Sequence, residues 1–413
     1  MAQKGYSENR RTLLIVFTTV CLDLIGFGII IPIQPFLAQT LGATPALVTL
    51  LGASFSLMQF LFAPVWGRLS DRIGRRPVML ISIAVSAVGY LLFGLAGSLP
   101  LLFFARMLSG FGTANIGTAQ AIIADCTSPE TRARGMGLIG AAFGLGFILG
   151  PALGGVLGQF GLAAPAFAAA GFCTGNWFFA FFQLPETYQR RSGNGSTHHF
   201  FSLSALTRAA RHPNVAQLLL LYLFYPIAFS LMEQVLGLFI EASWLVEKAD
   251  VSASSHAKRA AGLTAAVLIV VGITSTIIQG GLIGRLARRF GERRLLMVGL
   301  VLMGFTFLAI PFVGSLGPFG LMLPVGALLA TGSALANPSL TSLLSRAVGT
   351  DEQGGTLGLG QSLGALGRVV GPASAGFLFQ TYRGLPFFFG SVLLFACSII
   401  SSTIRFERPT RVR

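Results

Sequence analysis

The feature that most constrains this chain is a succession of apolar stretches, separated by short segments that hold most of its charge. A helix needs about 20 mostly apolar residues to cross a bilayer. Only 10% of the residues are charged, and the mean hydropathy is +0.75, which is more apolar than a soluble fold requires. The sequence therefore predicts an all-α membrane protein.

Twelve stretches are long and apolar enough to be predicted as spans, and the Gly and Pro within several of them soften the boundaries. The predicted spans are 12–37, 46–67, 77–97, 99–124, 134–158, 163–184, 214–241, 262–284, 295–314, 317–345, 355–380 and 385–404. The basic segment 1–11 precedes an apolar run that is too long for a signal-peptide core. We therefore expect the first helix to be retained.

The net charge of +15 could indicate binding to nucleic acid, but its distribution follows membrane topology. Nearly all Lys and Arg outside the spans lie in alternate segments, namely 1–11, 68–76, 132–134, 185–213, 285–294, 346 and 405–413. The intervening segments hold only Lys248, Lys258, Arg259 and Arg383. By the positive-inside rule both termini and the central linker are predicted to be cytoplasmic, and no nucleic-acid partner is expected.

The cysteines and the paired histidines indicate no metal site. All four cysteines fall in or at the end of predicted spans, without a CxxC pair, and are expected to be unreactive thiols. They are Cys21, Cys126, Cys173 and Cys397. His198 and His199 are adjacent in a polar linker and lack further ligands, so solvated linker is favoured over a metal centre.

An internal repeat indicates the architecture. The segment 67–76 reads GRLSDRIGRR, and 217 positions later the segment 284–293 reads GRLARRFGER. A second echo pairs 150–155, GPALGG, with 371–376, GPASAG, 221 positions on. We therefore predict two pseudo-symmetric six-helix bundles, residues 1–184 and 214–413, joined by a cytoplasmic linker, 185–213. Two such bundles can rock about a central site.

Four motifs resemble those of the major facilitator superfamily. They are the loop 67–76, the fourth-helix pattern RxxxGxGxA at 106–114, the fifth-helix pattern GxxxGPxxGG at 146–155, and the first-helix pattern LDxxGxGxxxP at 22–32. The last is similar to the drug/proton antiporter branch, particularly the tetracycline-exporter-like multidrug transporters. This resemblance implies a monomeric transporter in the bacterial inner membrane that is not an enzyme. It would exchange protons for small amphipathic or lipophilic molecules and need no other cofactor.

Asp23 most strongly indicates chemistry, because it lies near the middle of the first predicted span. A carboxylate there costs about 2.5–3.5 kcal/mol to insert, and such groups usually face a cavity and perform work. Loss of water favours its protonated form, so the group could carry a proton between the two sides. The alternative is a structural carboxylate bonded to backbone that Gly26, Gly28 and Pro32 loosen.

Arg106 lies within the fourth predicted span and needs a partner, because a guanidinium keeps its proton and is costly inside a bilayer. At helical spacing it shares a face with Gly110 and Gln120. The resemblance implies that the first and fourth helices face one cavity, so we expect Arg106 to respond to the charge of Asp23. A buried ion pair or a clamp on backbone carbonyls is the alternative.

Glu233 is predicted as the third proton-coupling residue, about twenty residues into the seventh span. Tyr222, Tyr225 and Phe229 recur at helical spacing on its side. Aromatic walls with one acid suit apolar or cationic ligands. Aromatic packing with an acid near the outer surface stays open as the alternative, and Glu241 is expected to be simply exposed.

The other polar residues predicted in the substrate cavity are few: Gln34, Asn115, Gln120, Gln234, Asn337, Gln361 and Arg368. A proton symporter or facilitator for a sugar, peptide, organic acid or siderophore would usually carry more hydrogen-bonding groups. That function is kept as the alternative, together with a non-transporting membrane receptor.

The loop after the second span is predicted to be a conformational latch. Asp71 can accept bonds from helix N-termini and cations of the opposite half when the cytoplasmic side is closed, whereas Arg288 takes its place in the second half. The latch and gating residues are Gly67, Asp71, Arg72, Gly74, Arg75, Arg76, Asp125, Glu130 and Arg134, with Gly146, Gly150, Pro151, Gly154 and Gly155 as a bent small-residue ridge at the outer gate. The alternative for the loop is that its charges only set the orientation in the membrane. The alternative for the glycine ridge is that it only allows close packing of helices.

Overall fold

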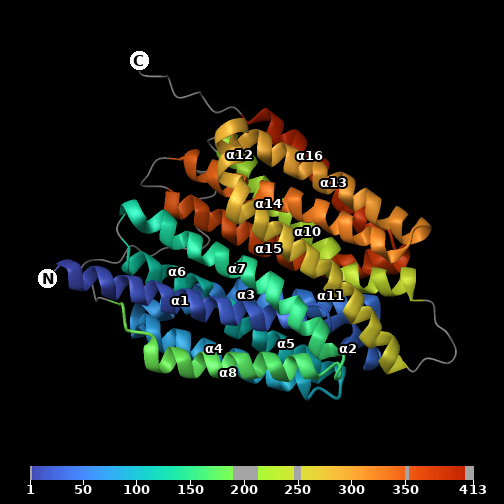
Figure 1. Cartoon of the computed structure of the whole chain (residues 1–413), viewed down its shortest axis with the longest axis horizontal. Helices are drawn as coiled ribbons and strands as arrows, with labels where there is room; N and C mark the ends of the chain where they lie inside the picture. Colours follow the sequence, from blue (N-terminus) through green and yellow to red (C-terminus); the bar gives the residue numbers. More distant parts are fainter. Residues whose placement is uncertain (1, 128, 189–212, 246–252, 349–352, 405–413) are drawn as a thin grey trace.

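The computed structural model describes residues 2–127, 129–188, 213–245, 253–348 and 353–404, and these form helices that run along the molecule in twelve passages (Figure 1). In chain order they are α1 (Ala2–Ile30) with α2 (Gln34–Thr40), α3 (Pro45–Ile73), α4 (Arg75–Gly94), α5 (Leu99–Gly112) with η1 (Thr113–Asn115) and α6 (Ile116–Asp125), α7 (Pro129–Gly158), α8 (Ala164–Gln183), α10 (Pro213–Trp244), α11 (Ala253–Ile277) with η2 (Ile278–Leu282) and α12 (Ile283–Phe290), α13 (Glu292–Leu316), η3 (Phe319–Leu321) with α14 (Met322–Arg346), α15 (Gln353–Thr381) and α16 (Leu385–Thr403).

The passages have the dimensions of membrane spans. Among the described residues, nine helices are long and apolar enough to cross a bilayer. The other three, α7, α8 and α15, have 30, 20 and 29 residues, and α15 in particular is rich in Gly and polar residues. Since a helix rises about 1.5 Å per residue, each can span a hydrocarbon core of about 30 Å. The predicted all-α membrane fold is confirmed.

Three passages that were predicted as continuous helices are interrupted. The first breaks at 31–33 before α2, where Pro32 and Pro35 remove backbone donors. The fourth breaks in the 3₁₀ turn η1, where Ala114 has φ −73° and ψ 15°. The eighth contains the π-helical turn η2, which includes Gly280 and Gly281. The helical parts before and after each break can therefore point in different directions.

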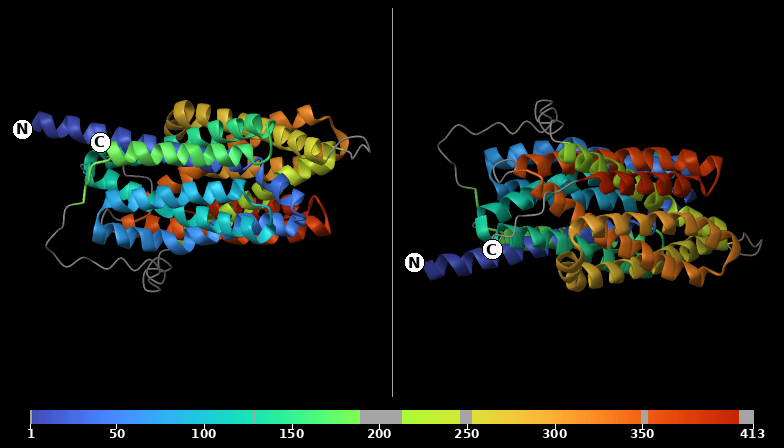
Figure 2. Two further views of the ribbon diagram at one scale, coloured as in Figure 1. Left: turned by 90° about the horizontal axis from the view of Figure 1, so that it is seen from below. Right: turned by 90° about the horizontal axis from the view of Figure 1, so that it is seen from above.

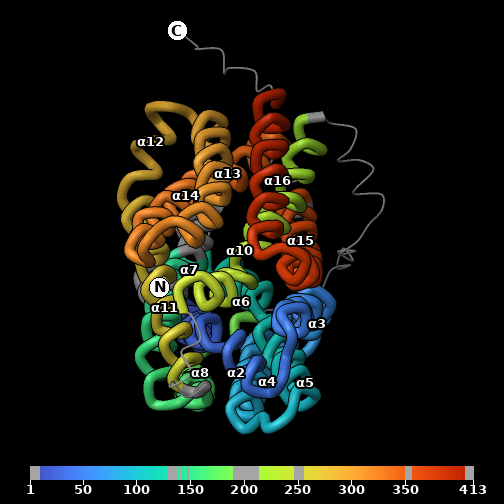
Figure 3. Tube along the Cα trace, turned by 90° about the vertical axis from the view of Figure 1, so that its right-hand side faces the viewer, coloured from blue at the N-terminus to red at the C-terminus, as the bar shows by residue number. Residues whose placement is uncertain are grey.

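The helices form two bundles, α1–α8 and α10–α16 (Figures 2 and 3). In the first, α1 packs on α7 and α8, and α4 packs on α5 and α8; in the second, α10 packs on α15 and α16, and α13 packs on α14 and α16. The start of α1 and the end of α16 lie at one end of the molecule (Figure 1), which we call the terminal face; the α1–α2 break lies toward the opposite face. Most of the predicted linker lies outside the described residues, so its limits stay a prediction.

The two bundles meet at the opposite face, through α3 against α15 and α7 against α11. A Cβ added at Gly376 would lie 2.5 Å from the Cα of Ala46, and one added at Gly155 would lie 2.3 Å from the Cβ of Ala265. Small residues therefore bring the backbones of the two bundles into direct contact. The molecule is closed at the opposite face.

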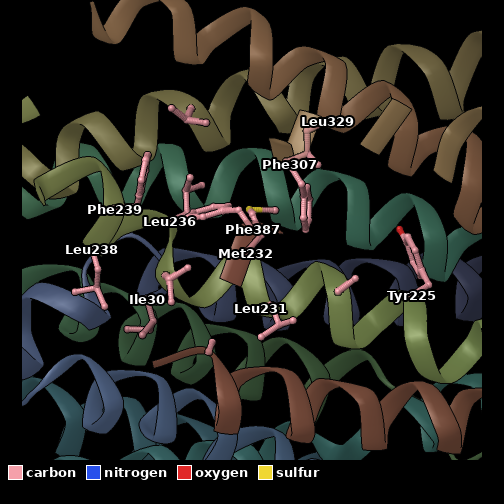
Figure 4. Packing of buried hydrophobic residues seen from close by; sticks show 14 of the residues in the cluster. Ile30, Tyr225, Leu231, Met232, Leu236, Leu238, Phe239, Phe307, Leu329 and Phe387 are labelled. Atoms are coloured by element: carbon pink, nitrogen blue, oxygen red, sulfur yellow. The ribbon is translucent and has the colours of Figure 1, made fainter. Parts of the chain in front are cut away.

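Aromatic and aliphatic packing fixes α10 within the second bundle (Figure 4). The rings of Phe239 on α10 and Phe387 on α16 meet edge to face, with centroids 4.9 Å apart. Met232 and Leu236, which flank Glu233 in sequence, are also buried in this cluster. Because α10 is anchored on this side, its other side is directed toward the first bundle.

Candidate functional site

Asp23 lies on α1 in a polar pocket inside the first bundle. The residue is only 7% exposed, and one of its carboxylate oxygens accepts a hydrogen bond of 3.3 Å from Nδ2 of Asn115. The other oxygen accepts a weak bond of 3.9 Å from the Sγ of Cys173 on α8. Asn115 lies in the η1 break and also donates to Ser82 on α4, at 2.8 Å. The break in the fourth passage thus supplies the amide that holds the carboxyl group.

Two members of this pocket, Tyr90 on α4 and Cys173 on α8, were not predicted. Tyr90 is fully buried, its hydroxyl has no hydrogen-bond partner among the described residues, and it lies close enough to Asp23 and Arg106 for their charges to act on it. At Gly26 an added Cβ would lie 3.3 Å from Cys173 Sγ and 3.6 Å from the Tyr90 ring. The absence of a side chain at Gly26 admits both residues beside the carboxyl group.

Arg106, on α5, is held by aromatic faces. The residue is 4% exposed, and its guanidinium carbon lies 4.1 Å from the ring centroid of Phe55 and 5.7 Å from that of Phe27. Nε and Nη1 have no hydrogen-bond partner in the described part of the chain. An unpaired buried polar group costs about 1–3 kcal/mol, and more when it is charged. The π faces offset part of this cost by cation–π attraction and leave the donors unused.

Glu233 lies near enough to one arginine of each bundle for their charges to act on it. Its charge interacts with that of Arg368 on α15 and with that of Arg106 on α5. Its neighbour Gln234 approaches α3 so closely that a Cβ at Gly52 would meet its amide oxygen. Glu233 therefore faces the first bundle, at the seam, and not the outer surface.

The aromatic face of α10 is tied to α14. Tyr222 donates to Thr341 at 2.9 Å, and the hydroxyl groups of Tyr225 and Ser333 are 3.0 Å apart. Phe229 is half-buried, with its ring 6.4 Å from that of Tyr225. Both tyrosines thus use their hydroxyl groups within the second bundle, and Phe229 is the member of this face with accessible surface.

The polar residues predicted in the cavity differ in exposure. Gln34 is buried at the start of α2 with its Oε1 unpartnered in the described chain, Asn115 is buried with Asp23, and Gln234 is half-buried at the seam. The remaining four are exposed although they belong to long apolar passages: Gln120, Asn337, Gln361 and Arg368. These four have side chains that a ligand or water could reach.

In the loop between α3 and α4, Arg75 joins several predicted latch residues. Its guanidinium pairs with Asp71, donates to Ser70 at 2.6 Å and lies 3.4 Å from the carboxylate of Asp125. Asp71 keeps a side chain that is 60% exposed. In this conformation the pairs lie within the first bundle, and Asp71 is still accessible to a further partner.

The other latch residues occupy the edges of this loop. Arg72 is exposed, Gly67 has open space beside it, and Arg76 donates to the backbone oxygen of Phe181 at 2.7 Å. The side chains of Glu130 and Arg134 lie outside the described residues. The predicted latch is therefore only partly assembled around Arg75.

Glu186, which was not predicted, caps α4. Its carboxylate accepts hydrogen bonds from the backbone N–H groups of Arg75, at 2.9 Å, and Arg76, at 3.2 Å. Gly74 has φ 105°, a conformation that other residues rarely adopt, and a Cβ there would lie 2.4 Å from a Glu186 oxygen. A negative charge at a helix N-terminus stabilises free N–H groups, so this contact fixes the turn.

The repeated loop between α12 and α13 has its own ion pair. Glu292 accepts from Arg346 at 3.0 Å and from the hydroxyl of Ser342 at 2.5 Å. Gly291, which corresponds to Gly74 in the repeat, has φ 81°, but nothing lies within 4 Å of an added Cβ. The second loop therefore copies the backbone of the first without the cap.

The predicted ridge on α7 packs against α1. A Cβ at Gly150 would lie 2.5 Å from the Cα of Gly28, and the same test at Gly146 and Gly154 meets α1 at 2.6 and 2.3 Å. Pro151 is buried within the helix. Gly155 faces the other way, toward α11 of the second bundle. One helix therefore connects the Asp23 helix with the closed opposite face.

Glu241 corrects a prediction. It was expected to be exposed, but its side chain is only 19% exposed because Gln39 of α2 and His256 of α11 lie against it. Gln39 of α2 donates to it at 2.9 Å across the seam, and His256 of α11 lies 3.5 Å away. The bond from Gln39 joins the two bundles at the opposite face, beside a hollow of about 610 Å³ that Gln39, Glu241 and Arg383 help to line.

Known proteins resemble the chain along almost its whole length. The family model described as Major Facilitator Superfamily matches residues 16–372 and 256–413. A class G tetracycline resistance protein of Vibrio anguillarum is 33% identical, covering 94% of this chain and 96% of that protein; multidrug resistance protein 2 of Bacillus subtilis (strain 168) is 26% identical over 95% and 94%. The crystal structure of a human organic anion transporter is 27% identical, with a TM-score of 0.68 over 95% and 99%.

Proposed function

Because this chain belongs to the Major Facilitator Superfamily, we propose that it exports small amphipathic or lipophilic molecules in exchange for protons, by alternating access. The chain is a multi-pass membrane transporter and not an enzyme. The names of its relatives concern resistance to tetracycline and to multiple drugs, which favours export. An identity near 30% supports the transport class but does not fix the substrate, which must be inferred from the site.

The observation that carries the proposal is the placement of Asp23. The carboxyl group is buried in mid-helix, where it costs about 2.5–3.5 kcal/mol to insert. Its partners are the weak donors of Asn115 and Cys173 rather than a basic side chain. A carboxyl group without a paired cation can be neutral when enclosed and ionised when wetted, which is the behaviour that a proton carrier needs.

The second element is a route from one side of the membrane. The excess of Lys and Arg on the terminal face favours a cytoplasmic orientation for that face, in what we take to be a bacterial inner membrane. Polar side chains exposed to lipid in mid-span are costly, so the accessible Gln120, Asn337 and Gln361 favour a wet cavity between the bundles. With the opposite face closed, that cavity would open to the cytoplasm.

In the transport cycle, substrate enters this cavity from the cytoplasm or the inner leaflet. Rocking of the bundles then closes the terminal face and opens the other, where proton uptake by Asp23, assisted by Glu233 and Arg106, releases the substrate. One pH unit contributes about 1.4 kcal/mol per proton, and 100 mV contributes about 2.3 kcal/mol per charge. Together they support a substrate gradient of several hundredfold, on the order of 10².

The test is reconstitution of the full chain in proteoliposomes with an imposed pH gradient and a panel of drug-like dyes. Wild-type protein should accumulate a dye against its gradient, and Asp23→Asn should lose that accumulation. The variant should retain dye exchange without a pH gradient, which shows that it folds and binds. Equal gradient-driven accumulation by both proteins would remove Asp23 from proton coupling.

A further inference from the structure

A histidine and a glutamate of neighbouring helices meet at the opposite face. Nε2 of His256 on α11 lies 3.5 Å from Oε1 of Glu241 on α10, and the His256 side chain is 22% exposed. This separation is longer than an N–H···O hydrogen bond, which usually measures about 2.7–3.2 Å. The two side chains are therefore adjacent and partly accessible, but they are not joined by a well-formed hydrogen bond.

The same separation fits two ligands of one tetrahedral metal ion. Zn²⁺ lies about 2.0–2.1 Å from a histidine nitrogen and about 2.0–2.2 Å from a carboxylate oxygen. At the tetrahedral angle, two ligand atoms at these bond lengths lie about 3.3–3.5 Å apart. His256 and Glu241 could thus hold such an ion without rearrangement. The imidazole nitrogen favours zinc over Mg²⁺ and Ca²⁺, which prefer oxygen ligands.

The second oxygen of Glu241 is held by the other bundle. Oε2 accepts a hydrogen bond of 2.9 Å from Nε2 of Gln39 on α2, which leaves Oε1 on the side of His256. In metal sites the ligating carboxylates are themselves hydrogen-bonded, and loss of such a partner costs about 10–100-fold in metal affinity. Gln39 is therefore placed to orient the carboxylate and not to occupy the metal-binding oxygen.

The surroundings give an ion access to this pair. Glu241 and Gln39 line the hollow of about 610 Å³ at the opposite face, which has room for an ion and its water. Arg383 lines the same hollow, but its guanidinium donates to the backbone oxygen of Ala242 at 3.1 Å. Among the residues described, the charge of Glu241 is therefore left for His256 or for a bound cation.

From this geometry we infer that His256 and Glu241 bind Zn²⁺ or a similar transition-metal ion at the opposite face, with Gln39 as the positioning residue. The described residues place no third acid, histidine or cysteine with the pair, so water completes the coordination. Such a site exchanges its ion with the surroundings and is not needed for folding. It shares no residue with the proposed proton-coupling set and goes beyond the proposed function.

Metal binding at this place is coupled to the conformation of the transporter. Gln39 belongs to the first bundle and Glu241 to the second, so opening of the opposite face separates them. The metal binds more tightly to the state in which Gln39 still orients the carboxylate, and a ligand shifts an equilibrium toward the state that it binds better. Zinc therefore holds the opposite face closed.

Calorimetric titration with zinc chloride tests the site on the untagged full chain in phosphatidylcholine nanodiscs. The other histidines are removed in all samples, by His198→Asn, His199→Asn and His212→Asn. We expect one bound ion, and His256→Ala and Glu241→Gln should each weaken its binding at least tenfold. Arg259→Gln, at an exposed side chain one turn farther along α11, is the matched control and should bind zinc as the parent does. Absence of zinc binding, or binding that neither variant weakens, overturns the inference.

Two further variants separate a ligand from a structural residue. His256→Asp supplies a carboxylate ligand and should bind zinc more tightly than His256→Ala, whereas Gln39→Leu should weaken binding about tenfold. Equal losses from the two changes at His256 would overturn its role as a ligand. Zinc should also lower hydrogen–deuterium exchange of the backbone at 40–44 in the parent but not in His256→Ala, and unchanged or faster exchange in the parent would overturn the coupling to closure.

Discussion

The loop between α3 and α4 and the loop between α12 and α13 share one backbone and carry inverted charges. Each turns at a glycine of positive φ, Gly74 or Gly291. In the first, Arg75 pairs with Asp125 at the end of α6; in the second, Glu292 pairs with Arg346 at the end of α14. The two ion pairs occupy corresponding positions in the two halves, but the acid and the base have exchanged places.

The comparison separates what the turn needs from what the latch needs. Either polarity closes the turn, since both loops keep an ion pair within their own bundle. What the first loop has in addition is the cap from Glu186 and the exposed Asp71. Both loops are otherwise rich in arginine, so Asp71 is the exposed acid that could meet the cations of the second loop if the terminal face closed.

The largest effect should come from the two turn glycines. Gly74→Ala combines the strain of an unusual backbone conformation, about 1–3 kcal/mol, with displacement of the Glu186 carboxylate from two backbone N–H groups, about 1–3 kcal/mol more. Gly291→Ala carries the strain alone, since its surroundings are open. Thermal unfolding in one detergent should therefore show the lower midpoint for Gly74→Ala. In a Glu186→Ala background the two alanine variants should become similar, and equal midpoints in the wild-type background would refute the role of the cap.

Asp71→Arg gives the first loop the residue that Arg288 provides in the second. The turn and its Arg75–Asp125 pair should remain, but the accessible acid is lost and a positive charge takes its place. We expect gradient-driven transport to slow about tenfold, which corresponds to about 1.4 kcal/mol in the barrier. Arg288→Asp is the control and should change the rate by less than Asp71→Arg. Similar losses from both changes would mean that the loops contribute equally.

A smaller effect is expected at the opposite face, where bonds cross between bundles instead of staying within them. Gln39→Leu removes the bond to Glu241, and a hydrogen bond to a charged group contributes about 1.5–3 kcal/mol at most. Partial exposure should reduce this to roughly a two- to fivefold shift toward the outward-open state. Hydrogen–deuterium exchange of the backbone at 40–44 should rise. Unchanged exchange there would show that the packing of α3 on α15 holds this face closed by itself.

The smallest effect is expected for the second ion pair. Arg346 has a side chain that is 62% exposed, and exposed pairs contribute about 0.2–1 kcal/mol. Glu292→Arg should lower the unfolding midpoint by only a few degrees, and Glu292→Arg with Arg346→Asp should recover part of the loss by copying the polarity of the first loop. A double variant no better than the sum of the single ones would show that the pair is not coupled.

The membrane fold and its charged residues could be predicted because both leave strong physical signals. Each span must be long and apolar, and each ionisable residue within a span is costly enough to be noticed, as with Asp23, Arg106 and Glu233. The repeat of 67–76 at 284–293 was equally visible, and in it Gly291 corresponds to Gly74. These features depend only on local sequence and on the properties of the bilayer, so they can be recognised in a single sequence.

Features set by packing between distant segments could not be predicted in the same way. Asn115 reaches Asp23 because η1 interrupts the fourth passage without a proline, where Gly112 abuts Ser86 of α4. Tyr90 follows Ser86 at helical spacing, a weak polar stripe that was available as a signal. Glu241 was misjudged because the end of its span was uncertain, and the partner that covers it comes from α2.

The contact between Gly28 and Gly150 restricts which sequences this architecture can adopt. The backbones of two glycines are in contact there, so no side chain is present that could change its rotamer to make room for an added methyl group. A homologue with alanine at either position must have moved its first and fifth passages apart, and with them the pocket around the acidic group. Glycine at both places is therefore a test for choosing relatives whose pocket geometry can be transferred to this protein.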